Sequence, residues 1–112
     1  MTIFQKIIDR QIPASIVYED EHVLAFDDIN PVAPVHVLVI PKRAITSLAH
    51  AEPDDEAVLG KMLLAARKVA ELKGVHESGF RTVINNGRDA LQSVFHVHLH
   101  VIAGRPMAWP PG

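Results

Sequence analysis

In the segment FHVHLHVI, residues 95–102, a histidine occupies every second position from His96 to His100. Successive side chains on a strand point to opposite faces of the sheet. The spacing therefore predicts that the segment is a strand, with His96, His98 and His100 on one face and the intervening valine and leucine in the core. The chain is expected to contain a sheet on which three titratable rings lie side by side.

A short helix is predicted at the start of the chain. Thr2 and Gln5 have the spacing of a capping box, and apolar residues follow Thr2 at helical intervals. Pro13 is expected to end this helix, because proline has no N–H to donate to a further helical turn.

Turn residues and hydrophobic periodicity predict the remaining elements. A hairpin of strands 16–20 and 22–28 precedes a buried strand over 35–41, a long helix runs from Pro53 to Gly74, and a strand over 81–85 comes before the polar loop 86–93. The final strand is 95–102. This order of elements predicts an α+β domain, in which one long and one short helix pack on an antiparallel five-stranded sheet.

The composition favours one domain over residues 1–112, since 112 residues with 48% hydrophobic content make one compact unit. The formal charge of −2, with dispersed Lys and Arg, argues against binding to long nucleic acids. The sequence contains no stretch of about 18 apolar residues, so no membrane span is predicted. With no cysteine and no basic, apolar leader in the sequence, we expect a cytoplasmic protein.

Three neighbouring histidines require an electrostatic explanation, because each protonation near a pKa of about 6.5 makes the next one less favourable. An anionic ligand is one explanation and a metal is the other. His96 and His100 lie about 13 Å apart on an extended strand, so one ion could bind only two of the three rings. The other ligands would have to come from His36, His50, His76 or Asp89. We expect no metal or cofactor, with metal-dependent catalysis as the alternative.

The stretch NNGRDALQSVFHVHLHVIAGRP resembles the histidine-triad (HIT) superfamily, whose pattern is His-x-His-x-His followed by two apolar residues. IFQKII, DINPVAPVHVLVIPKR, QSVFHVHLH and AWPPG resemble its histidine-triad nucleotide-binding (Hint) branch and together span nearly the whole chain. The galactose-1-phosphate uridylyltransferase branch has glutamine at the position of His100. The dinucleoside polyphosphate hydrolases of the superfamily usually lack the AWPPG ending.

The resemblance implies a purine nucleoside phosphoramidase, which hydrolyses the P–N bond of adenosine 5′-phosphoramidates and releases AMP. His98 would attack phosphorus and form a nucleotidyl-histidine, and the backbone carbonyl of His96 would fix the tautomer of its ring. Ser93 would meet the departing nitrogen, and His100 would bind a phosphate oxygen. His36 and His96 would complete a proton-sharing cluster around His98.

The resemblance also implies a nucleotide site. Asp28 would accept hydrogen bonds from the ribose hydroxyls, and Asn85 would approach the phosphate. The other nucleotide-binding positions are apolar: Ile3, Phe4, Ile7, Phe26, Ile29, Leu38 and Val94. The chain departs from the family pattern at Leu91 and Ala103, where many relatives have glycine, which makes the approach of the loop to the phosphate less secure.

In this family the long helix and the sheet pair with a second copy, so the resemblance implies a homodimer with Trp109 near the partner's site. Two other functions remain open. One is a nucleotide-binding interaction or regulatory module with incidental hydrolysis, and the other is a dinucleoside polyphosphate hydrolase. The identity of the amine leaving group is not specified by any residue pattern.

Overall fold

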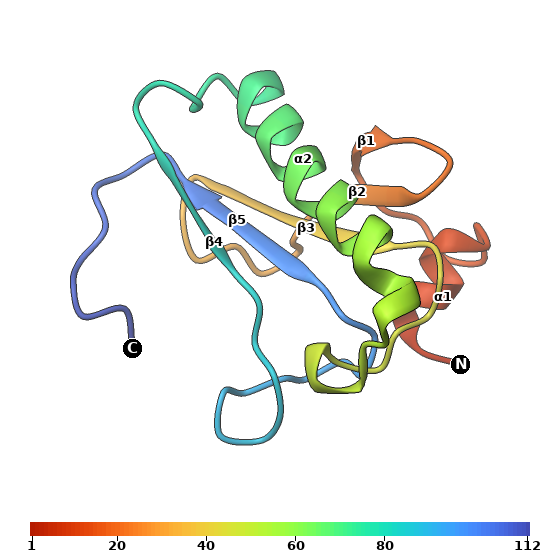
Figure 1. The fold of residues 1–112 in the computed structure, drawn as a ribbon. Helices are drawn as coiled ribbons and strands as arrows, with labels where there is room; N and C mark the ends of the chain where they lie inside the picture. The colour runs from red at the N-terminus through yellow and green to blue at the C-terminus, as the bar shows by residue number, and fades with distance from the viewer.

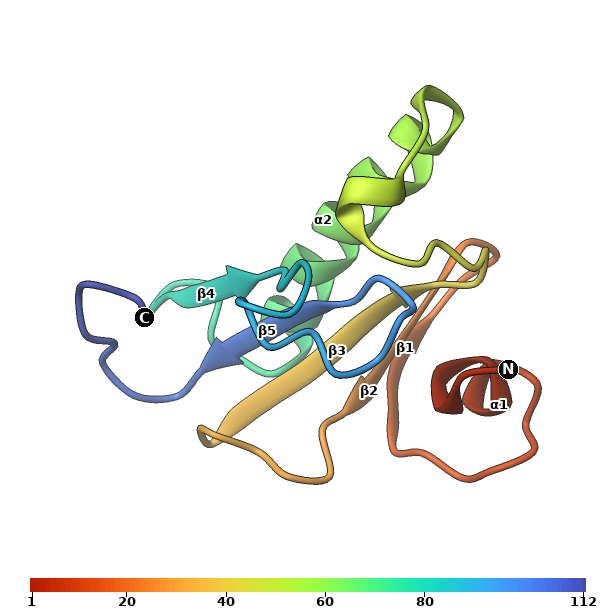
Figure 2. The ribbon, with the colours of Figure 1, turned by 90° about the horizontal axis from the view of Figure 1, so that it is seen from below.

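A five-stranded antiparallel sheet forms the centre of the computed structural model, which describes all 112 residues (Figure 1). The strands are β1 (Ile16–Glu19), β2 (Val23–Asp27), β3 (Val35–Pro41), β4 (Phe80–Val83) and β5 (Leu99–Ala103), in the spatial order β1-β2-β3-β5-β4. The short helix α1 (Ile3–Ile8) and the long helix α2 (Glu56–Leu72) lie on opposite faces of the sheet (Figure 2). The predicted α+β architecture is confirmed.

Strand β3 is buried on both faces and divides the core in two. Val37 and Val39 face α2, where they pack in one cluster with residues such as Met62. Leu38 and Ile40 face α1 and share a second cluster with Phe4 and Phe26. This two-sided burial explains why the strand reads as a nearly continuous apolar run in the sequence.

The pairing of β3 with β5 brings histidines from distant parts of the chain together. His100 lies opposite Leu38, and His36 lies opposite Ile102, so the two histidines are diagonal neighbours on the face that carries α1. The centroids of the two rings are 5.2 Å apart.

The predicted strand over 95–102 is wrong in its first half, because β5 begins only at Leu99. Its partner β3 ends at Pro41, which has no N–H to extend the ladder. The Pro41 carbonyl accepts from His96 Nε2 at 2.8 Å, and Val97 N–H donates to the Ile45 carbonyl at 2.6 Å. Side chains still alternate here, with Val97 in the cluster beneath α2 and the His96 ring edge-on to Phe4.

The first helix ends before its predicted stop at Pro13. Thr2 Oγ1 accepts from Gln5 N–H as the sequence predicts, but α1 stops at Ile8. Arg10 has a φ of 61°, and the amides of Arg10 and Gln11 donate to the carbonyls of Ile7 and Lys6. These bonds form a Schellman motif, built here on arginine in place of the usual glycine.

The long helix is preceded by a single 3-10 turn, Pro53–Asp55, so its α-helical part begins at Glu56. Strand β4 also begins one residue earlier than predicted, at Phe80. Neither helix is both long and apolar enough to cross a membrane.

Candidate functional site

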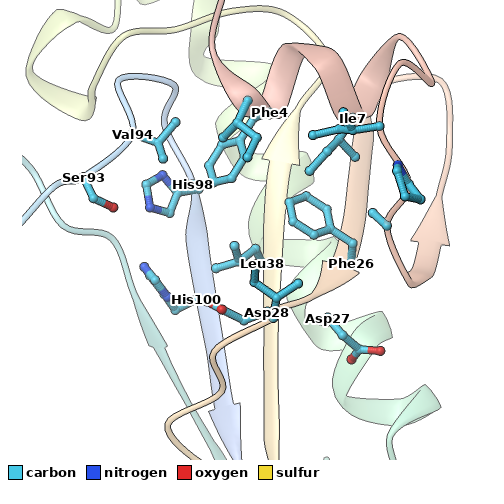
Figure 3. Close-up of a pocket in the computed structure, with 15 residues that line it drawn as sticks. Phe4, Ile7, Phe26, Asp27, Asp28, Leu38, Ser93, Val94, His98 and His100 are labelled. Atoms are coloured by element: carbon cyan, nitrogen blue, oxygen red, sulfur yellow. The ribbon is translucent and has the colours of Figure 1, made fainter.

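A pocket of about 280 Å³ lies between α1 and the sheet. Figure 3 shows Ser93, His98 and His100 at one end of this pocket and Ile7 and Phe26 at the other. Most of the lining is apolar, and the polar side chains belong to two aspartates, one serine and two histidines. The pocket is therefore suited to a ligand with a flat apolar part and a polar, anionic end.

Most of the residues predicted to bind a nucleotide line this pocket. They are Ile3, Phe4, Ile7, Phe26, Asp28, Ile29, Leu38 and Val94, and Ser93, His98 and His100 join them. His36, His96 and Asn85 are not part of the lining. Residues that the sequence did not suggest also contribute: Ile12, Pro13, Ala14 and Asp27. Ile12, Pro13 and Ala14 belong to the turn after α1, which carries no recognisable binding motif.

The ring of His98 is held with one nitrogen available to the pocket. Nδ1 lies 2.9 Å from the carbonyl oxygen of His96, and since a carbonyl only accepts, Nδ1 carries the proton. In the neutral ring, Nε2 then has a free lone pair. Burial lowers the pKa of His98, although the bond to the His96 carbonyl and the charge of Asp28 act in the opposite direction. His98 is therefore a neutral ring that presents a nucleophilic nitrogen.

The ring of His96 lies behind the pocket. It is 1% exposed, and Nε2 donates to the carbonyl oxygen of Pro41. Burial lowers the pKa of His96, the bond to the Pro41 carbonyl opposes this, and the repulsion that a protonated His98 would exert lowers it further. The structure thus does not bring the His96 ring into the proton-sharing cluster expected around His98. Only its backbone carbonyl reaches that ring.

His36 and His100 form a directed hydrogen-bonded pair. The amide N–H of Val32 donates to His36 Nδ1 at 3.1 Å, so the His36 proton must reside on Nε2. That Nε2 lies 2.9 Å from His100 Nδ1, which accepts the proton and leaves the His100 proton on its own Nε2. Asp28 Oδ2, 3.4 Å from His36 Nε2, also favours a proton on this nitrogen. His100 Nε2 is buried without a protein partner. It is therefore a donor available to a bound anion.

The environment of His100 keeps its ring neutral at physiological pH. Burial is the main cause that lowers the pKa of His100 to about 4, and the repulsion that a protonated His98 or His36 would exert adds to it. Asp28 opposes them. The neutral His100 ring can donate its Nε2–H to a phosphate oxygen. It does so without adding a positive charge beside His98.

We expect folding stability to fall as the pH is lowered from about 6.5 to 4. His96, His98 and His100 all have folded-state pKa values below the usual 6.5, so protons bind preferentially to the unfolded chain in this range. The measurement is the urea midpoint at half-unit pH steps.

His100→Gln, which cannot be protonated, should show a shallower fall in the urea midpoint than wild type. His76→Gln, at an exposed position, should keep the wild-type slope. Equal slopes for wild type and His100→Gln would contradict the assignment of a depressed pKa to His100.

The loop that carries Ser93 is fixed by a buried glutamine. Gln92 Oε1 accepts from the amide of Gly87, and its Nε2 donates to the carbonyls of Thr46 and Val94. Its amide oxygen and both amide hydrogens have partners, and the bond to Thr46 holds the loop against the segment after β3. Gln92 is a positioning residue that a polar loop sequence gives no reason to single out.

The two departures from the family pattern differ in their consequences. Leu91 has a φ of 63°, a left-handed conformation that costs a non-glycine residue about 1–2 kcal/mol. Ala103 is an ordinary, fully buried residue of β5 that pairs with Val35 and Phe80. The strain therefore lies in the loop beside Ser93, and the strand after the triad is undisturbed.

Asp28, His36 and His100 form the one group of side chains close enough to hold a metal ion, with ligand atoms within 4.8 Å of one another. Zinc bonds of about 2.0–2.1 Å at tetrahedral angles would place two nitrogens roughly 3.3 Å apart. His36 Nε2 and His100 Nδ1 are closer than this, at 2.9 Å, with a proton between them. Metal binding would have to displace that proton and separate the rings.

Comparisons with known proteins agree with this geometry. The HIT domain family matches residues 9–107 of the chain. An uncharacterized HIT-like protein of Synechocystis sp. is 58% identical over 99% of this chain and 96% of its own length. A protein of Zea mays named 14 kDa zinc-binding protein is 53% identical, covering 99% of this chain and 88% of its own length.

Solved structures show the same fold. The HIT family hydrolase from Legionella pneumophila superimposes with a TM-score of 0.97 at 44% identity, covering 100% of both chains. The histidine triad nucleotide-binding protein from Candida albicans superimposes with a TM-score of 0.83 at 34% identity, covering 98% of this chain and 83% of its own. With its sequence and its fold both matched over almost the whole length, the chain is a member of the HIT domain family.

Proposed function

We propose that this protein is a purine nucleoside phosphoramidase, which hydrolyses adenosine 5′-phosphoramidates to AMP and an amine. The observation that carries the proposal is the arrangement of His98. Its Nδ1 proton is fixed by the His96 carbonyl, and its Nε2 is left free in a pocket that also contains Ser93 and the donor nitrogen of His100. A protein that only binds nucleotides has no need of a ring held in this way.

The reaction follows from these groups in two displacements. The Nε2 lone pair of His98 forms a bond to phosphorus while the bond to the amine nitrogen breaks, and that nitrogen takes up a proton as it leaves. The Ser93 hydroxyl lines the pocket and can relay this proton from solvent. Water then attacks phosphorus and loses a proton to solvent, and the bond to Nε2 breaks to restore the neutral ring.

The pocket offers distinct places for the parts of the nucleotide. Phe4 and Phe26, with centroids 5.7 Å apart, provide apolar surface for a purine base. Asp28 provides carboxylate acceptors for the ribose hydroxyls, and His100 Nε2 provides a donor to the phosphate. Likeness to a structure named as a histidine triad nucleotide-binding protein supports this use of the pocket.

Likeness to a structure named as a HIT family hydrolase supports hydrolysis as the general reaction. The choice of a P–N bond is tested by comparing AMP linked through nitrogen to tryptamine with diadenosine polyphosphates, at equal concentration. We expect the phosphoramidate to be hydrolysed with a kcat/KM at least about 100-fold higher. Faster cleavage of the diadenosine polyphosphate would identify a dinucleoside polyphosphate hydrolase. Tight AMP binding without turnover of either substrate would identify a nucleotide-binding module.

Dialysis against EDTA is expected to leave the phosphoramidase activity unchanged, because the Nε2–H of His100 stabilises the phosphate charge in this scheme. Added zinc is expected to inhibit, because an ion between His36 and His100 displaces their shared proton. Activity is assayed after the chelator has been removed, with bound metal measured in the same sample. Loss of activity on dialysis, restored by zinc, would show that the reaction requires the metal.

We also propose that the protein is a cytoplasmic homodimer. Leu63, Leu64 and Leu72 on α2 are more than half exposed, and a second copy packed on this helix would remove exposed leucine surface from water. Trp109 is 81% exposed and lies 5.8 Å from the guanidinium of Arg81 on β4. Sedimentation equilibrium at micromolar concentration should give twice the monomer mass, and Leu64→Glu should lower it. A wild-type monomer would contradict the homodimer.

A further inference from the structure

The loop between β2 and β3 determines which nitrogen of His36 carries the proton. Asp28 N–H donates to the His36 carbonyl at 2.9 Å, and Asn30 N–H donates to Asp28 Oδ1 at 2.8 Å. Val32 N–H then donates to His36 Nδ1 at 3.1 Å. The loop thus folds back onto the histidine that follows it, and a backbone amide holds His36 Nδ1 unprotonated.

Two residues just after β5 hold this loop from outside. Gly104 has a φ of 94°, and a Cβ built there would lie 2.8 Å from Pro34 Cβ, so only glycine permits the observed packing. Arg105 Nη2 donates to the carbonyl oxygen of Val32 at 3.2 Å. Both contacts are made by the turn that leaves the strand on which His100 lies.

We propose that Gly104 and Arg105 are positioning residues that keep Val32 N–H on His36 Nδ1, and thereby present His100 Nε2 to the pocket as a hydrogen-bond donor. The path has three links, from Arg105 to the Val32 carbonyl, from the Val32 amide to His36, and from His36 Nε2 to His100 Nδ1. The expected effect of these two residues on the reaction rate rests on the proposed phosphoramidase function. Their expected effect on the tautomers of His36 and His100 is independent of that function.

Release of the loop weakens the direction of the path. If Val32 N–H moves away, the Asp28 carboxylate, with Oδ2 3.4 Å from His36 Nε2, still favours a proton there, but a share of the His36 rings can take the proton on Nδ1 and accept at Nε2. His100 Nδ1 must then donate, which leaves a lone pair on His100 Nε2. A lone pair facing a phosphate oxygen repels it, so the pocket loses its donor at the reacting group. Arg105 is exposed, and neither it nor Gly104 lines the pocket, so both act through the loop alone.

The test is the tautomeric state of His36 and His100, read from ring ¹⁵N chemical shifts of the full-length protein, with resonances assigned from His36→Gln and His100→Gln. In wild type we expect protons on Nε2 of both rings. Arg105→Met and Gly104→Ala should each give a measurable share of Nδ1–H at both positions. Arg105→Lys, which keeps a donor, should remain closer to wild type. Arg67→Met, which removes an exposed arginine on α2, should leave the shifts unchanged.

A kinetic readout separates the two proposals. Arg105→Met should lower the single-turnover rate with a phosphoramidate about tenfold, with a smaller change in AMP affinity. If wild type has no phosphoramidase activity, the proposed function fails, while the ¹⁵N shifts still decide the positioning role. Nδ1–H on His36 in wild type overturns the inference. The inference is also overturned if Arg105→Met is folded, as judged from its amide spectrum, and the tautomers of His36 and His100 are the same as in wild type.

Discussion

His98→Asn is expected to lower turnover of a purine nucleoside phosphoramidate by several powers of ten, because asparagine has no nucleophilic nitrogen to form the intermediate. The fold should be retained. The asparagine amide can donate to the His96 carbonyl in place of His98 Nδ1, which lies 2.9 Å from it. AMP binding, measured by calorimetry, should therefore stay within about tenfold of wild type.

The matched control for this substitution is His76→Asn, which makes the same change at an exposed histidine outside the pocket. It should retain wild-type kcat and KM. If His98→Asn kept more than about a tenth of wild-type activity, nucleophilic catalysis by His98 would be ruled out. If it lost AMP binding and turnover together, its effect would be on the pocket as a whole.

Ser93→Ala is expected to slow formation of the nucleotidylated protein on the order of 10²-fold while leaving its hydrolysis nearly unchanged. General acid assistance is worth about 10² to 10⁴ in rate, and only the first displacement expels an amine that must be protonated. The Ser93 side chain lines the pocket at the end where His98 and His100 lie (Figure 3). Rapid quench separates the two steps, since the burst rate should fall while the decay rate of the adduct stays constant.

Ser78→Ala is the control for Ser93→Ala, because Ser78 does not line this pocket and its hydroxyl makes only a weak 3.5 Å contact with the Val75 carbonyl. Equal slowing of both steps in Ser93→Ala would show that the hydroxyl positions the substrate and does not serve the leaving amine. A phosphoramidate with a less basic leaving amine, which needs less help from a proton, should show a smaller effect of the substitution.

Most of the fold is predictable because each element has its own local signal. The apolar run VHVLVIP defines β3 at both ends, since it is buried on both faces. The sequence predicts a longer last strand than the structure has, because the alternation of side chains over 95–102 continues where the hydrogen-bonded ladder does not. The difference arises from Pro41 on the partner strand, and a pattern within residues 95–102 contains no information about that partner.

The candidate site is also predictable from the sequence only in part. Most side chains that line the pocket are recognisable from the sequence because they follow a family pattern, and the exceptions are Ile12, Pro13, Ala14 and Asp27. The groups that set the state of the rings are backbone atoms: the His96 carbonyl for His98, the Pro41 carbonyl for His96 and the Val32 amide for His36. Almost any residue could supply them, so no residue type marks them. Only the His96 carbonyl is anticipated, through the family resemblance, and the roles of the other two groups follow from three-dimensional positions.

The most direct test of the account is to locate the covalent intermediate. Wild-type protein mixed with excess adenosine phosphoramidate and quenched in alkali within milliseconds should be heavier by one adenylyl group. Peptide mapping should place that group on His98. The adduct should be labile in acid, as a phosphorus–nitrogen bond is, and absent from His98→Asn. An adduct on His96 or His100, or turnover with no adduct at any quench time, would contradict the assignment of His98 as the nucleophile.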